Sequence, residues 1–113
     1  MTGPPVVLRV DGGVIAERCY FARRPLARLV GLLATPDLSR DEALWLQPCS
    51  SVHTYGLRAP IGAAFIDAAG VVIKVVDPLP RGRVARAAGT RAVVECRVGV
   101  LSGIAPGAVM SAE

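Results

Sequence analysis

Cys49 and His53 are the residues of this sequence best suited to chemistry, and they lie four positions apart. His53 is the one histidine of the chain. An imidazole beside a thiol can act as its base and yield a nucleophilic thiolate, so the pair is compatible with thiol-dependent catalysis, with Arg58 as an anchor for an anionic substrate. The alternative is structural: His53 hydrogen-bonds to the backbone of its loop, and Cys49 is a small packing residue.

A metal site at the same pair is disfavoured. A thiolate and an imidazole can share a zinc ion, but a closed zinc site needs four ligands and this spacing supplies two. The sequence has no Cys-x-x-Cys and no second histidine, so Cys19 or Cys96 would have to complete the set from elsewhere in the fold. We therefore predict no metal and no cofactor.

The segment Pro48–Pro60 is irregular in pattern and carries further polar residues. Loops held by a rigid scaffold often form binding sites, so we expect a shallow pocket for a small anionic or polar ligand, with Arg58 as the charge anchor and Tyr55 as a wall. The alternative is a loop that covers one end of a barrel, with Arg58 paired to an acid such as Asp67. The candidate ligand-binding residues are Cys49, His53, Thr54, Tyr55 and Arg58.

Strands must hold this loop, because β-branched and alternating apolar runs dominate the chain. Glycine-containing turns at 11–13 and 68–70 predict hairpins, and Asp67 is expected to cap the second turn. The predicted strands are Val6–Val10, Val14–Tyr20, Ala43–Gln47, Ile61–Asp67, Val71–Val76, Ala92–Arg97 and Ala108–Met110. In the sixth of these, Glu95 and Cys96 should lie on opposite faces.

One helix is predicted, over Pro25–Ala34. Leu26, Leu29, Val30 and Leu33 recur at helical spacing, and Pro25 suits a first helical turn. The sequence thus predicts a mainly β (α+β) fold, a small antiparallel barrel or curled sheet with one short packed helix. A length of 113 residues suits a single domain over 1–113.

Three stretches carry a resemblance to a known family. Residues 49–67 read CSSVHTYGLRAPIGAAFID, residues 27–33 read ARLVGLL, and residues 92–99 read AVVECRVG. In this order they resemble the uncharacterised family called domain of unknown function 192, over roughly residues 14–112. The resemblance implies a small β-rich domain and supplies no activity, substrate or cofactor. Gly62 departs from the family pattern, which usually has Asp after Pro-Ile.

The charge is positive, with a net value of +4, and Lys74 is the one lysine among thirteen basic residues. Arginine pairs well with phosphate, but the arginines are spread along the chain and aromatic residues are few, so nucleic-acid binding is disfavoured. Arg81, Arg83 and Arg86 form a local basic stretch that is either a solvated face or an anion or partner contact.

No membrane span is expected, because Lys74 interrupts the apolar run Val71–Val76. The N-terminus lacks the pattern of a signal peptide, so the cytoplasm is the expected compartment, and the three cysteines are expected to be free thiols.

These observations lead to one preferred hypothesis. The chain is a non-enzymatic binding or accessory domain that presents the Cys49–Arg58 loop to a small anionic or polar ligand or to a protein partner. The alternative is a thiol-dependent enzyme that uses Cys49 and His53.

Overall fold

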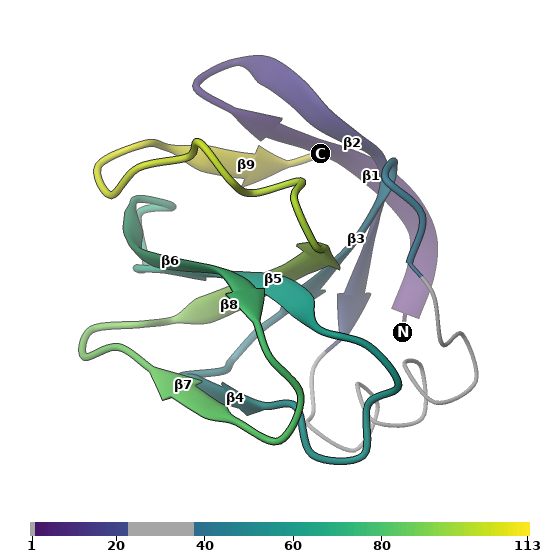
Figure 1. Ribbon diagram of the computed structural model, residues 1–113. Helices are drawn as coiled ribbons and strands as arrows, with labels where there is room; N and C mark the ends of the chain where they lie inside the picture. Colours follow the sequence, from purple (N-terminus) through teal and green to yellow (C-terminus); the bar gives the residue numbers. More distant parts are fainter. Residues whose placement is uncertain (1, 23–37) are drawn as a thin grey trace.

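The computed structural model describes residues 2–22 and 38–113, and within these ranges the chain consists of strands joined by turns (Figure 1). The strands found there are β1 (Thr2–Val10), β2 (Gly13–Ala22), β3 (Glu42–Leu46), β4 (Ser51–His53), β5 (Ile61–Ile66), β6 (Val72–Leu79), β7 (Val84–Arg86), β8 (Ala92–Arg97) and β9 (Met110–Ala112). No helix occurs in these two ranges. The mainly β class is confirmed, whereas the helix predicted over Pro25–Ala34 falls outside the described residues.

Seven strands form one sheet in the order β6-β5-β8-β3-β2-β1-β9, and β4 pairs with β7 in a second, two-stranded sheet. All neighbouring pairs are antiparallel except β2 and β3, which run parallel. The predicted antiparallel pairing is therefore found at every neighbouring pair except this one. Parallel neighbours need a crossover connection instead of a hairpin, and hairpin signals alone cannot reveal them.

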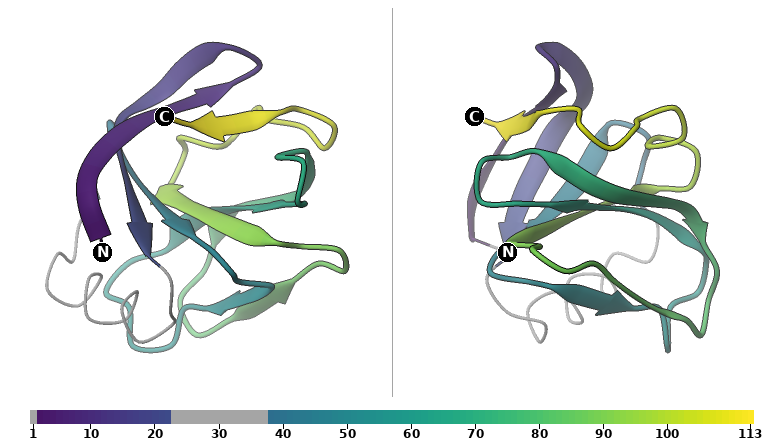
Figure 2. Two further views of the ribbon diagram at one scale, coloured as in Figure 1. Left: turned by 180° about the vertical axis from the view of Figure 1, so that it is seen from behind. Right: turned by 90° about the vertical axis from the view of Figure 1, so that its left-hand side faces the viewer.

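The large sheet curls until its two ends meet (Figures 1 and 2). The amide of Val72 donates to the carbonyl of Ala108 at 2.8 Å, and the amide of Met110 donates to the carbonyl of Gly70 at 2.9 Å. Val71 and Val109 form an isolated bridge between the same segments. These contacts confirm the curled sheet and satisfy part of the backbone at its two edges, which would otherwise offer unpaired amides and carbonyls there.

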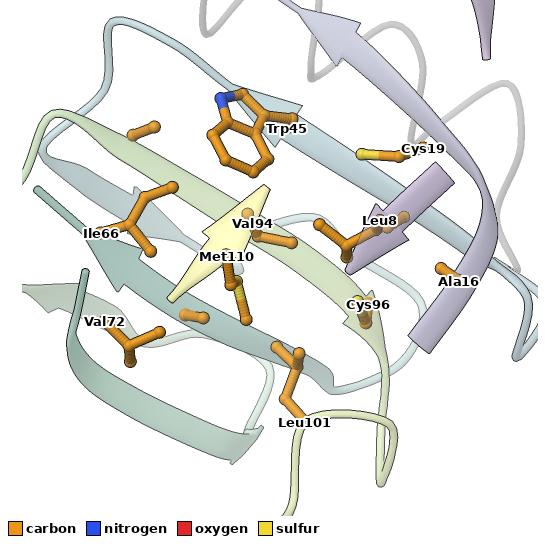
Figure 3. Packing of buried hydrophobic residues seen from close by; sticks show 13 residues of the cluster. Leu8, Ala16, Cys19, Trp45, Ile66, Val72, Val94, Cys96, Leu101 and Met110 are labelled. Carbon is orange, nitrogen blue, oxygen red and sulfur yellow. The ribbon is translucent and has the colours of Figure 1, made fainter. Parts of the chain in front are cut away.

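Strands β5 and β8 are buried on both faces, so their side chains serve two cores. On one face, Val94 of β8 and Ile66 of β5 pack with Trp45 of β3, Leu8 of β1 and Met110 of β9 (Figure 3). Aliphatic side chains from strands far apart in sequence thus form the first core.

The second core lies on the other face of the same strands. Val93 and Phe65 pack there with Leu46 of β3, and beneath Val52 of β4 and Ala85 of β7. The small β4–β7 sheet therefore acts as a cover over the large sheet, and burial of these apolar side chains fixes its position.

The two predicted hairpins are present, as β1–β2 and β5–β6, and β8 has the predicted bounds. Several other bounds differ. The segment predicted to be irregular contains β4, strand β6 continues to Leu79 instead of ending at Val76, and the last strand starts two residues later than expected. Strand β7 was not predicted.

Candidate functional site

Strands β4 and β7 position the Cys49–Arg58 segment. Ser51 faces Arg86 and His53 faces Val84 in the ladder, while Val52 and Ala85 point into the second core. Strands alternate their side chains between two faces, so His53 and Arg86 lie on the outer face of this small sheet.

Thr54 ties this segment to the chain that precedes β7. It is fully buried, its hydroxyl donates to the carbonyl of Pro80, and the amide of Arg83 donates to the same hydroxyl at 2.9 Å. Its own amide donates to the carbonyl of Arg83 at 2.8 Å, and its carbonyl accepts from Gly82 at 3.2 Å. The Thr54 hydroxyl, a predicted ligand contact, is thus engaged within the fold.

Tyr55 and His53 form an exposed aromatic pair. Their ring centroids are 5.7 Å apart with planes tilted by 38°, and Tyr55 is 56% exposed. A Cβ atom at Gly82 would lie 3.9 Å from Cε1 of Tyr55, so the tyrosine ring rests beside the Gly82 backbone. The fold therefore brings together two predicted site residues and leaves their rings accessible.

Cys49 precedes β4 and is partly buried. Its thiol donates to the carbonyl of Ser51 at 3.1 Å, and its amide donates to the carbonyl of Arg91 at 3.0 Å. Cys49 packs at the margin of the second core. All three cysteines are free thiols, as predicted.

The two stretches of sequence that contain β4 and β7 are rich in arginine and contain no acid. Residues 48–66 and 78–94 contain five arginines and no Asp or Glu. All five arginines are exposed. The exposed side chains on and around β4 and β7 are called here the basic face: His53, Tyr55, Arg58, Arg81, Arg83, Val84, Arg86 and Arg91.

Ion pairs among the described residues lie elsewhere. Arg18 of β2 contacts Asp41 at 3.2 Å and Glu42 at 3.9 Å. Asp67, an alternative partner considered for Arg58, instead accepts hydrogen bonds from the amides of Ala69 and Val71, both at 2.9 Å. The prediction that Asp67 caps its turn is confirmed.

Gly62 of β5 lies against Asp77 of β6. A Cβ atom at Gly62 would lie 2.7 Å from Oδ2 of Asp77, so the carboxylate occupies the space of a side chain at this position. That carboxylate accepts hydrogen bonds from the amides of Gly99 and Leu101, each at 2.9 Å. The departure at Gly62 thus has a steric reason in this chain.

Within residues 2–22 and 38–113, no three His, Cys, Asp or Glu side chains gather in a way that could hold a metal ion. In the same part of the chain, no helix has the length and apolar character that crossing a membrane requires.

Sequence reasoning singled out Arg81, Arg83 and Arg86 as a basic stretch but missed Val84 and Arg91. The signal that could have joined them to the Cys49–Arg58 segment is the absence of acids from both stretches, which is visible in the sequence.

A family model matches nearly the whole chain. The model of DUF192, described as "Uncharacterized ACR", matches residues 6–112. The chain belongs to the DUF192 family. A comparison with curated proteins gives no match.

Two solved structures share the fold. A protein of unknown function from Novosphingobium aromaticivorans DSM 12444 superposes with a TM-score of 0.75 at 24% identity, covering 96% of this chain and 83% of that one. A candidate transcription regulator from Sinorhizobium meliloti 1021 superposes with a TM-score of 0.77 at 16% identity, covering 99% of this chain and 98% of that one. At these low sequence identities, the two structures show that this DUF192 protein shares their fold, and they show nothing further.

Proposed function

We propose that this DUF192 protein is a non-enzymatic binding domain that takes an anionic ligand on the basic face. The observation that carries the proposal is the charge of two segments distant in sequence, residues 48–66 and 78–94, which contain five arginines and no acid. The β4–β7 ladder holds these segments side by side.

The arginines of the basic face are available to a ligand. Among the described residues, the acids that form ion pairs do so with Arg18, on β2. Guanidinium groups are always protonated and match the geometry of phosphate and carboxylate oxygens. A face with exposed guanidinium groups and no acid of its own attracts anions and repels cations.

The placement of Thr54 and Cys49 favours binding over catalysis. Both make hydrogen bonds to backbone carbonyls, which stabilise the segment that presents His53 and Arg58. A rigid support lowers the entropy lost when a ligand is bound. The thiol-dependent alternative requires Cys49 to be an activated nucleophile.

Titration with inorganic polyphosphate, followed by isothermal calorimetry, tests the proposal. Arg58→Gln and Arg86→Gln should each weaken binding about tenfold, because each removes a charge-assisted hydrogen bond of about 1.5 kcal/mol or more. Arg9→Gln is the matched control, since Arg9 lies on β1, away from β4 and β7 (Figure 1). Equal affinities for the three variants and the parent would contradict the assignment of the site.

A further inference from the structure

We infer that the anionic ligand of the basic face is a single-stranded nucleic acid. The inference rests on the proposed function and goes beyond it, since it requires a ligand with unpaired bases as well as charge. Two independent features of the face support it, the arrangement of its arginines and its exposed aromatic pair.

The fold gathers arginines that the sequence disperses. Arg86 faces Ser51 in the β4–β7 ladder, and the backbone of Arg83 is hydrogen-bonded to that of Thr54. The carbonyl of Arg91 accepts from the amide of Cys49, and Arg58 follows the turn closed by the hydrogen bond from Leu57 to Thr54. Positive charge therefore extends over several neighbouring segments, as a chain of phosphates requires.

Aromatic residues are few in this chain, yet one of them is on this face. The Phe, Trp and Tyr side chains all belong to the described residues, and of these Tyr55 alone is exposed, while the others are buried or partly buried. Exposing a tyrosine ring at 56% forgoes apolar burial, and the ring lies beside Gly82 and the ring of His53. An exposed ring on a segment whose backbone neighbours carry arginines resembles the platforms on which single-stranded bases stack.

The presence of both arginines and an exposed tyrosine ring on this face favours some classes of anionic ligand over others. An anion without bases would contact the arginines but would not stack on Tyr55. In a duplex the bases are stacked on each other, so they are not available to stack on a tyrosine ring. Unpaired bases present π-faces that stack on tyrosine while their phosphates contact arginine. Val84, 51% exposed and opposite His53, adds apolar surface beside the pair.

Fluorescence anisotropy with labelled single-stranded RNA of about 12 nucleotides tests the inference. Parallel titrations use single-stranded DNA, the corresponding duplex and inorganic polyphosphate as a base-free competitor. The variants are Tyr55→Leu, Arg86→Gln and the control Arg9→Gln, each checked for an unchanged melting temperature. Tyr55 is exposed and is not a buried residue of the second core, so Tyr55→Leu should fold as the parent does.

We expect one of the two single strands to bind in a salt-dependent way, more tightly than duplex. Tyr55→Leu should weaken this binding about tenfold and leave polyphosphate binding unchanged, whereas Arg86→Gln should weaken both. Polyphosphate binding without binding of either single strand would overturn the inference and leave the proposed function standing. Equal binding of duplex, or no effect of Tyr55→Leu, would also overturn the inference. No binding of any of these anions would overturn both.

Discussion

Cys49 differs from the other two cysteines in its surroundings, and this difference decides which thiol can react. Burial raises the pKa of Cys19 to about 12, and burial also raises the pKa of Cys96, which lies in the same core (Figure 3). A thiol reagent attacks the thiolate, so these two cysteines should be inert in the folded protein. Cys49 is partly exposed and should be the one that reacts.

A thiol titration near pH 8 should therefore modify one cysteine in the native protein and all three in denaturant. Mass spectrometry of peptides identifies the labelled residue. The same experiment tests the thiol-dependent alternative: Cys49 labelling faster than free cysteine, and slowed by His53→Ala, would favour catalysis. A rate close to that of free cysteine in both proteins would leave Cys49 as a packing residue.

The Thr54 hydroxyl is another side chain whose role is measurable. Thr54→Val keeps the shape but removes the bonds of the buried hydroxyl to the Pro80 carbonyl and the Arg83 amide, so two hydrogen bonds are lost. We expect a loss of about 1–3 kcal/mol in the free energy of unfolding. Urea denaturation measures it, and Thr54→Ser, which keeps the hydroxyl, is the control. A Thr54→Val protein as stable as the parent would show that the hydroxyl bonds contribute nothing.

At the scale of strands and turns, the contact between β5 and β6 at Gly62 makes a sharp prediction. A methyl group at Gly62 would lie 2.7 Å from Oδ2 of Asp77, whose carboxylate is held by the amides of Gly99 and Leu101. Gly62→Ala should lower the free energy of unfolding by about 1–3 kcal/mol, because the carboxylate cannot move without losing these bonds.

Thermal or urea unfolding checks this cost against Gly13→Ala, where the added Cβ would lie 3.5 Å from the carbonyl oxygen of Val10. In an Asp77→Ala background the cost of Gly62→Ala should shrink, since the obstructing carboxylate is gone. An unchanged cost in that background would mean that the strain lies somewhere other than at Asp77.

The elements that sequence analysis predicted are those with local signals. The β5–β6 hairpin has two apolar runs around a glycine turn, and the side-chain pattern of residues 92–97 identifies β8. Strands β4 and β7 are three residues long, and in each one apolar residue points inward between two exposed ones. Such a pattern is too short to distinguish from a loop.

The candidate site was predictable in part for the same reason. His53 and Arg58 are recognisable as residue types, whereas Arg83 and Arg86, which lie on the segment paired with β4, come about thirty positions later than His53. Which distant segments pair depends on the packing of Val52 and Ala85 into a shared core. That packing is a property of the whole fold, so spacing in the sequence cannot reveal it.

At the scale of the whole molecule, the buried thiols predict how stability responds to alkali. Cys19 and Cys96 have raised pKa values in the folded state, so the unfolded state loses their protons first. The contribution of these thiols to the free energy of unfolding is complete below the pKa that a cysteine has in the unfolded chain, near 9. It is lost as the pH rises from there towards the pKa in the folded protein, which is about 12 for Cys19. The expected slope is about 1.4 kcal/mol per pH unit for each thiol.

Urea unfolding at a series of pH values measures this slope. The double variant Cys19→Ala and Cys96→Ala should be less stable throughout because of the cavities it creates, yet its stability should fall less steeply above pH 9. Parallel curves for the two proteins would show that these thiols do not ionise on unfolding.

The joining of the first and last strands has a consequence for the order of folding. Leu8 of β1 is paired with Ala112 of β9, so one ladder connects the two extremes of the described chain. Contacts of such long sequence separation carry a large loop-closure entropy and form late, whereas the β5–β6 hairpin can form early. The first core is sealed only when Met110 of β9 arrives beside Leu8. We therefore expect a folding intermediate in which the sheet is partly formed and its edges are still unpaired. The pairing of these edges is the step that we expect to limit the folding rate.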